Sequence, residues 1–282
     1  MYEREPAVAG QFYEHSAVSL KKEIENCFLK KGFGPEQLPK VKAKGERKII
    51  GILVPHAGYM YSGPIAANSY FNLALDGKPE DFIIIGPNHT GMGTSISIMD
   101  ECEWKTPLGK VKINSEIARK ILEKGTITKK DLTAHIQEHS VEVQLPFLQY
   151  VYKNFQFVPV CMLDQTYEAC LDLGNSIAEV ISNKNAVIIA SSDFTHFERN
   201  ETAHKQDKKA LEAIKKLDAK KFLEVVEYEN MSVCGYGPIA AMLIAAKKLN
   251  AKSCEVLKYA TSGDITGDES RVVGYAAAKV IK

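Results

Sequence analysis

Four segments of the chain share one pattern: an unbroken apolar run rich in β-branched residues, then a turn, then a helical stretch. These runs cover residues 48–54, 81–86, 155–161 and 185–191. Unbroken apolar runs of this length are typical of strands that are buried on both faces. Because such strands alternate with helical stretches, the pattern predicts an α/β fold with a central mixed, largely parallel sheet flanked by helices.

The remaining elements follow from periodicity and turn residues. Helical periodicity covers residues 16–29, 63–75, 114–124, 139–152, 166–182 and 238–249, with two more helices within 202–228. Residues 95–111 predict a hairpin at a sheet edge, and 254–259 and 272–281 predict two further strands. The one linker-like stretch, 31–47, is too short to separate domains, so residues 1–282 are expected to form a single domain.

Composition narrows the class of protein. The chain is 45% hydrophobic and 25% charged with a formal net charge of +1, which excludes a disordered chain, a fibre and a global basic surface for nucleic acid. Its longest apolar stretches, about ten residues, fall short of the roughly 20 that a membrane helix needs. The first residues carry acids where a signal peptide would carry a basic region. We therefore expect a cytoplasmic protein without nucleic-acid or membrane partners.

Three of the seven histidines follow predicted strands: His56, His89 and His196. In open α/β sheets the carboxyl ends of the strands form the crevice where ligands bind. Imidazole is the commonest metal ligand in proteins, and two histidines with one anionic ligand leave coordination positions open. Asp193 adds a carboxylate to the turn that carries His196. The pattern predicts one shared site, with a fourth group available as a general base.

The segment His135–His139 matches the HxxEH pattern of inverzincins, in which two histidines on one helix bind zinc beside a glutamate base. Two other interpretations stay open. The segment is either the polar start of a helix, or it brings Glu138 and His139 to the shared site to orient a metal ligand. Nucleotide-binding glycine motifs and a GxSxG nucleophile motif are absent from the sequence.

Six motifs occur in one order along the chain. They are REPAVAGQFY from Arg4, PHAGY from Pro55, GPNH from Gly86, EHSVE from Glu138, SSDFTH from Ser191 and CGYGPI from Cys234. Together they resemble the Memo family (mediator of ErbB2-driven motility), whose prokaryotic members are also called AmmeMemoRadiSam system protein B. The resemblance runs from residue 4 to about residue 277. It implies a fold similar to the class III extradiol dioxygenases.

The resemblance also implies a metal site. Carried over, its ligands are His56, His89 and Cys234, with Asp193 and His196 beside them, and the implied metal is Fe(II) or Cu. Cys234 stands where the dioxygenases have a glutamate ligand. A thiolate favours softer metals and is itself oxidisable, which argues against ring cleavage. We further expect Tyr59 and Tyr61 to line the cleft, since a phenol offers an apolar ring with a polar tip.

Three functions follow from this reading. The first is a metal-dependent oxidoreductase in which His196, oriented by Asp193, acts as acid and base. The second is a metal-binding or redox protein that acts through a partner, with Cys234 as a thiol whose pKa is lowered by nearby imidazoles. The third is a peptide-binding module. The resemblance implies a radical-SAM protein and an AMMECR-type protein as partners, or a phosphotyrosine peptide.

Overall fold

The centre of the molecule is a mixed sheet that is parallel in its middle. The structure, a computed structural model, describes residues 2–43 and 45–282, and its strands form a 12-stranded sheet. The central strands lie in the order β8 (Gln156–Met162), β3 (Asp81–Pro87), β9 (Ala186–Ser191) and β2 (Ile49–Val54), all mutually parallel. Nearly every residue in them is buried, which confirms the α/β fold and the four predicted strands.

Shorter and antiparallel strands extend the sheet on both sides. Beside β2 lies β12 (Val272–Ile281), which also pairs with β11 (Ser253–Thr261) and β10 (His196–Glu198). Beyond β8 lie β6 (Gly109–Ile113), β5 (Glu103–Thr106) and β1 (Glu3–Arg4). The short strands β4 (Ile96–Ile98) and β7 (Thr128–Lys130) pair with each other, and β4 also pairs with β8.

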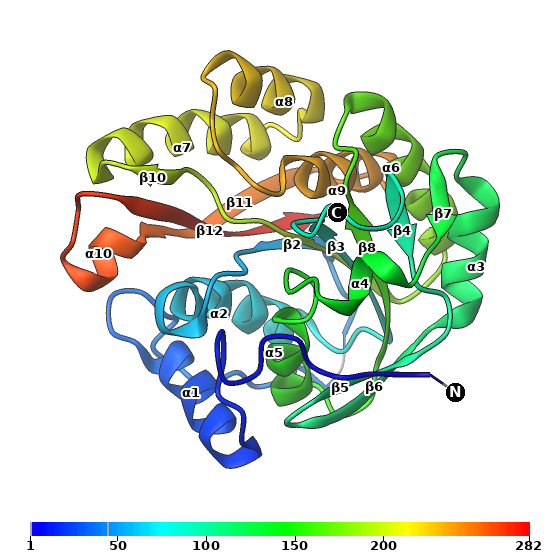
Figure 1. The fold of residues 1–282 in the computed structure, drawn as a ribbon, viewed down its shortest axis with the longest axis horizontal. Coiled ribbons are helices and arrows are strands. Elements are labelled where there is room, and N and C mark those ends of the chain that lie inside the picture. The colour runs from blue at the N-terminus through cyan, green and yellow to red at the C-terminus, as the bar shows by residue number, and fades with distance from the viewer. Residues whose placement is uncertain (1, 44) are drawn as a thin grey trace.

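Helices cover both faces of the sheet (Figure 1). One face carries α1 (Ala17–Leu29), α2 (Tyr59–Asp76) and α5 (Gln144–Val151). The other carries α6 (Tyr167–Ile181), α7 (Asn200–Lys215), α8 (Ala219–Tyr228) and α9 (Tyr236–Lys248), with α3 (Ser115–Lys124) against α6. The short helices α4 (Thr133–Ile136) and α10 (Ser262–Thr266) lie in connections.

Two helices begin four or five residues away from the predicted position, and one predicted hairpin is shorter than expected. Helix α2 begins at Tyr59 instead of residue 63. Helix α5 begins at Gln144 instead of 139, after a turn in which the Val143 N–H donates to the His139 carbonyl and the Gln144 N–H donates to the Val141 carbonyl. The hairpin predicted within 95–111 is present over residues 103–113, where β5 and β6 pair across the turn after Thr106, while the first half of that stretch forms β4, which pairs antiparallel with β8.

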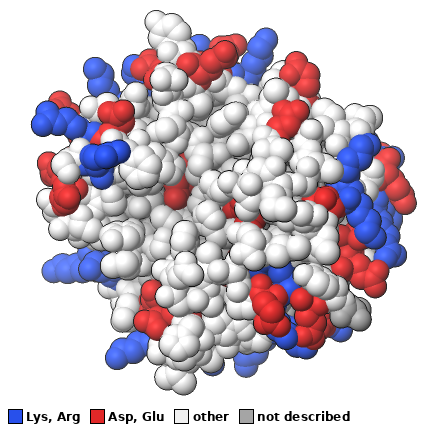
Figure 2. Space-filling model, viewed as in Figure 1, with Lys and Arg blue, Asp and Glu red and all other residues white. Residues whose placement is uncertain are grey.

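The described residues contain no helix long and apolar enough to cross a membrane. On the face drawn in Figure 2, Lys and Arg side chains intermingle with Asp and Glu around the outline, and the middle is largely uncharged.

Candidate metal centre

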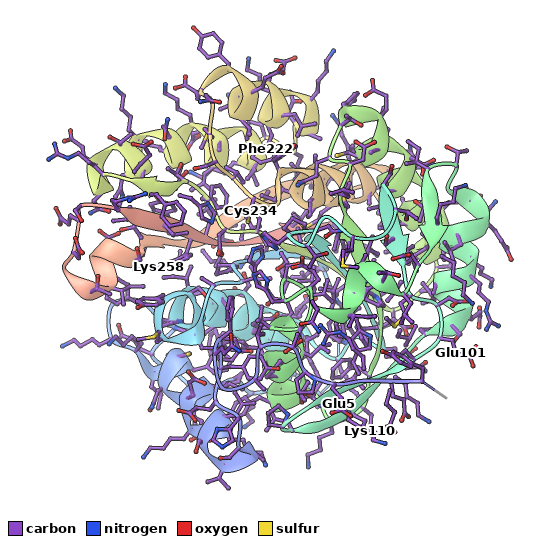
Figure 3. All side chains as sticks on the ribbon, in the orientation of Figure 1. Glu5, Glu101, Lys110, Phe222, Cys234 and Lys258 are labelled. Atoms are coloured by element: carbon purple, nitrogen blue, oxygen red, sulfur yellow. The ribbon has the colours of Figure 1, made fainter. Side chains whose placement is uncertain are left out.

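His56, His89 and Cys234 converge at the carboxyl edge of the parallel strands. His56 follows β2, His89 follows β3, and Cys234 lies two residues before α9. One ligating atom from each lies within 4.8 Å of the others, and Cys234 Sγ is 3.2 Å from His56 Nε2. Figure 3 shows Cys234 near the middle of the view, where the segment after α8 enters α9. The geometry brings together the three side chains that the resemblance named.

The buried hydrogen bonds around His56 fix which ring nitrogen carries its proton. Ser191 Oγ donates its one hydrogen to the Ser140 carbonyl (2.7 Å), so it accepts from His56 Nδ1–H at 2.9 Å. The Nε2 lone pair of His56 therefore faces Cys234. Burial, together with the neighbouring imidazoles, holds the pKa of His56 well below its usual value. The ring is thus neutral, which is the form that binds a metal.

His89 is oriented in the same way by Glu138. Its Nδ1–H donates to Glu138 Oε1 at 2.9 Å, which leaves Nε2 free toward the site. The fully buried carboxylate also accepts the backbone N–H groups of His89, His139 and Ser140. Burial acts to raise the pKa of Glu138, but these hydrogen bonds and the nearby imidazoles lower it to about 2. A carboxylate behind a ligand imidazole fixes its orientation and raises its basicity.

His196 and Asp193 lie beside this cluster but do not pair with each other. His196 Nδ1–H donates to the Ser232 carbonyl at 2.7 Å, so its Nε2 is also free. Asp193 Oδ1 accepts the backbone N–H of His56 at 2.8 Å, and Oδ2 lies 4.0 Å from His56 Nε2. Burial raises the pKa of Asp193 to about 6. The prediction that Asp193 orients His196 is therefore wrong: the Ser232 carbonyl does so, a contact without a sequence signal.

Cys234 is half-buried and lies against polar neighbours. Its Sγ accepts the backbone N–H of Asp193 at 3.3 Å and lies 3.6 Å from the Asp193 carbonyl oxygen. Burial and the Asp193 carboxylate raise the pKa of the Cys234 thiol, contrary to the predicted lowering by imidazoles. In the metal-free protein this group is a thiol, and a coordinated metal is what would ionise it.

A second group of potential ligands, His89, Glu138 and His139, is equally compact. Its carboxylate is occupied, because both Glu138 oxygens accept hydrogen bonds from the protein. His139 stacks on His89 with ring centroids 4.6 Å apart, and burial lowers its pKa to about 4. These contacts favour the first group as the ligand set and give Glu138 and His139 supporting positions around it.

Comparison with known proteins places the chain in a family. The family model described as "Memo-like protein" matches residues 4–279. The chain belongs to the Memo family. It is 49% identical over 278 residues to a MEMO1 family protein of Methanopyrus kandleri, with 98% of each chain covered. A MEMO1 family protein of Methanothermobacter thermautotrophicus is 47% identical over 275 residues, covering 97% of this chain and 98% of its own.

A solved structure supports the fold. An uncharacterized protein of Escherichia coli K12 superposes with a TM-score of 0.56 at 12% identity, covering 82% of this chain and 99% of that one. At this identity the likeness concerns the fold alone.

One wall of the site in this Memo-family chain comes from the N-terminal segment, which sequence reasoning missed. The Phe12 ring lies 4.7 Å from that of His139, and the Phe12 carbonyl accepts the Tyr59 N–H. Glu142, fully buried, holds this segment in place. Its carboxylate accepts hydrogen bonds from Arg4 Nη1, the backbone N–H groups of Ala7 and Val8, and the Tyr13 hydroxyl. The REPAVAGQFY motif was the available signal.

The structure places Tyr59 in the core, so its expected position in the cleft wall is wrong. The ring packs 4.8 Å from Phe147 and the hydroxyl donates to the Val143 carbonyl. Tyr59 is the first residue of α2 and belongs to the buried residues of that helix. Tyr61 is half-buried and packs against a small apolar cluster that includes Ile65 and Tyr275.

The HxxEH interpretation as a zinc protease site is also wrong. His135 lies in α4, which ends at Ile136, so the two histidines are not on one helix. His135 is fully buried, with Nδ1 3.3 Å from Cys161 Sγ, and its Nε2 has no hydrogen-bond partner among the described residues.

Proposed function

We propose that this protein holds one transition-metal ion between His56, His89 and Cys234 and acts as an oxidoreductase at that ion. The observation that supports the proposal is the hydrogen bonding behind the imidazoles. His56 and His89 each have Nδ1–H engaged by a buried acceptor, so each turns an Nε2 lone pair toward the thiol. If the three side chains had only a structural role, the two imidazole rings would not need to be in the same tautomer.

The donor set limits the chemistry. Two imidazoles and one thiolate suit iron or copper, and three protein ligands leave positions for a substrate or oxygen. When bound, such a metal supplies one-electron chemistry or activates a ligand. Ring cleavage of the extradiol type is not part of the proposal, because Cys234 supplies sulfur where those enzymes use a carboxylate.

The chain's own groups would handle protons. His196 carries its proton on Nδ1 and has a free Nε2, so it can take a proton from a ligand next to the metal. Asp193 holds the His56 backbone by accepting its N–H and is itself buried, with Oδ2 4.0 Å from His56 Nε2. Cys234 must release its proton as the metal binds, so metal affinity should increase with pH.

Metal titration of anaerobic protein tests the proposal. Fe(II), Cu(I) and Co(II) are added separately, excess metal is removed, and the bound metal is measured by elemental analysis. We expect one ion per chain and, for Co(II), a sulfur-to-metal charge-transfer absorption that disappears in Cys234→Ser. The matched control is Cys254→Ser, because Cys254 is a partly buried cysteine outside the site. This variant should retain both the bound ion and the charge-transfer absorption. Protein that retains none of the three metals would refute the proposal and favour the peptide-binding alternative.

A further inference from the structure

The edge of the sheet that carries the metal centre also carries exposed apolar side chains. Met60, Met92, Leu163 and Phe197 follow β2, β3, β8 and β9, respectively. Each is 45–69% exposed. Because these strands are adjacent and parallel, their carboxyl ends bring the four side chains to one end of the sheet. Single exposed apolar residues need no explanation, but a group around a polar cluster is typical of a ligand-binding surface.

Phe197 has a strained backbone. Its φ is 63°, in the left-handed region that a bulky residue rarely adopts. The flanking residues His196 and Glu198 pair with β12, and the register shifts between them. Since the ring is 62% exposed, its burial does not offset the strain. Bulges and strained residues of this kind are concentrated at functional sites, where they direct a side chain.

The Phe197 ring has two neighbours, His196 beside the metal centre and the cationic side chain of Arg271. Its centroid lies 5.7 Å from that of the His196 ring. The Arg271 guanidinium lies over the same ring, 5.4 Å from its centroid. Arg271 is exposed and forms no ion pair with any residue that the structure describes. Stacking on an aromatic face leaves the N–H groups at the edge of a guanidinium free to donate.

We propose that Phe197 and Arg271 form the specificity element of the site, and that its ligand is an organic anion with an apolar body. A carboxylate or phosphate group would accept hydrogen bonds from Arg271, while the apolar body lies over Phe197 and the exposed side chains near it. The strained backbone at Phe197 fixes the position of its ring, and the ring in turn positions the Arg271 guanidinium. This proposal rests on the proposed metal function and names the substrate class for it.

Three probes of the same chain length test the proposal: hexanoate, hexyl phosphate and the neutral hexanamide. Each is titrated by calorimetry into metal-free protein and into Co(II)-treated protein. The variants are Arg271→Gln, Arg271→Lys and Phe197→Gly, because glycine adopts the left-handed backbone without strain. The matched control is Arg119→Gln, which replaces an exposed arginine on α3 that pairs with Asp100 and Glu101.

We expect at least one anion to bind about tenfold or more tightly than hexanamide, the ratio that a charge-assisted hydrogen bond supplies. Arg271→Gln should abolish that preference and Arg271→Lys should keep part of it. Phe197→Gly should weaken anion binding about two- to fivefold, because Arg271 loses its aromatic partner. Arg119→Gln should bind as the wild type does. The more tightly bound of the two anions identifies the group as carboxylate or phosphate.

Equal binding of the amide and both anions, or an Arg271→Gln variant with unchanged anion preference, would overturn the proposal. The failure of the metal function is distinguishable from this. In that case Co(II) is not retained, while the metal-free protein still shows an anion preference that depends on Arg271.

Discussion

Replacing Glu138 with glutamine tests whether the carboxylate behind His89 serves the metal. In the native protein Oε1 accepts the N–H groups of His89 Nδ1, His139 and Ser140, and Oε2 accepts the His89 backbone N–H at 2.6 Å. Every neighbour of the carboxylate is therefore a donor. In Glu138→Gln one oxygen becomes an amide nitrogen, which faces a donor, and the His89 ring loses its charged acceptor.

The structure sets the size of the expected effect. Loss of a carboxylate behind a ligand imidazole lowers metal affinity about 10- to 100-fold, which is about 1.4–2.7 kcal/mol. One buried donor left without an acceptor lowers the free energy of unfolding of the metal-free protein by about 1–3 kcal/mol. Both losses should occur together, because the same hydrogen bonds orient His89 and satisfy buried N–H groups.

Competition with a chromophoric chelator measures the affinity, and urea unfolding of the metal-free protein measures the stability. Asp172→Asn is the matched control, since this carboxylate on α6 also accepts hydrogen bonds from four donors, on Thr126, Ile127 and Thr128. It should cost stability without changing metal affinity. A Glu138→Gln variant that is destabilised but binds metal like the wild type would refute the reasoning and make Glu138 a purely structural residue.

Three further predictions concern stability. Glu142→Gln should lower the free energy of unfolding by about 3–5 kcal/mol in urea titrations, because buried Arg4 loses its counter-ion. Burial lowers the pKa of His135 from 6.5 to about 4. As the pH falls, His135 is therefore protonated in the unfolded chain before it is protonated in the folded protein. Stability should therefore fall between pH 6.5 and 4, by about 3 kcal/mol from this group, and less steeply in His135→Leu. Gly274→Ala would place a Cβ 2.0 Å from Asp207 Oδ2, and we expect calorimetry to show a free energy of unfolding lower by about 1–3 kcal/mol. A stability equal to that of the wild type in Glu142→Gln or Gly274→Ala, or an unchanged pH dependence of stability in His135→Leu, would contradict the prediction concerned.

The sequence predicted the parts of the fold that depend on local pattern. Unbroken apolar runs identified the four central strands, and the histidines after three of them identified one edge of the sheet as the site. Cys234 lacked such a signal, because it precedes a helix from another part of the chain, and only the family resemblance connected it to His56 and His89. The tautomers depend on Ser191 and Glu138, whose partners are distant in sequence. Periodicity carries no information about such contacts.

Irregular backbone conformations could not be predicted from the sequence either, because they too depend on contacts that periodicity does not show. Before α5 the chain forms a turn, in which the N–H groups of Gln144 and Leu145 donate to carbonyls three residues earlier, and the regular helix begins only at Gln144. The left-handed backbone at Phe197 is set by pairing with β12, about 75 residues later in the chain. Neither sequence segment contains a glycine or proline at the relevant position that would indicate the irregularity.

The position of β12 has a consequence for synthesis of the protein. This strand follows all the others in the chain, yet it lies inside the sheet, between β2 on one side and β10 and β11 on the other. Until residues 272–281 leave the ribosome, β2 lacks one of its two partners and exposes an apolar edge that can pair with other chains. The loop that carries His56 begins at the end of β2. We therefore expect the loop that carries His56 to be held in place only after β12 has paired with β2, and a nascent chain that stalls before β12 to be a substrate for chaperones.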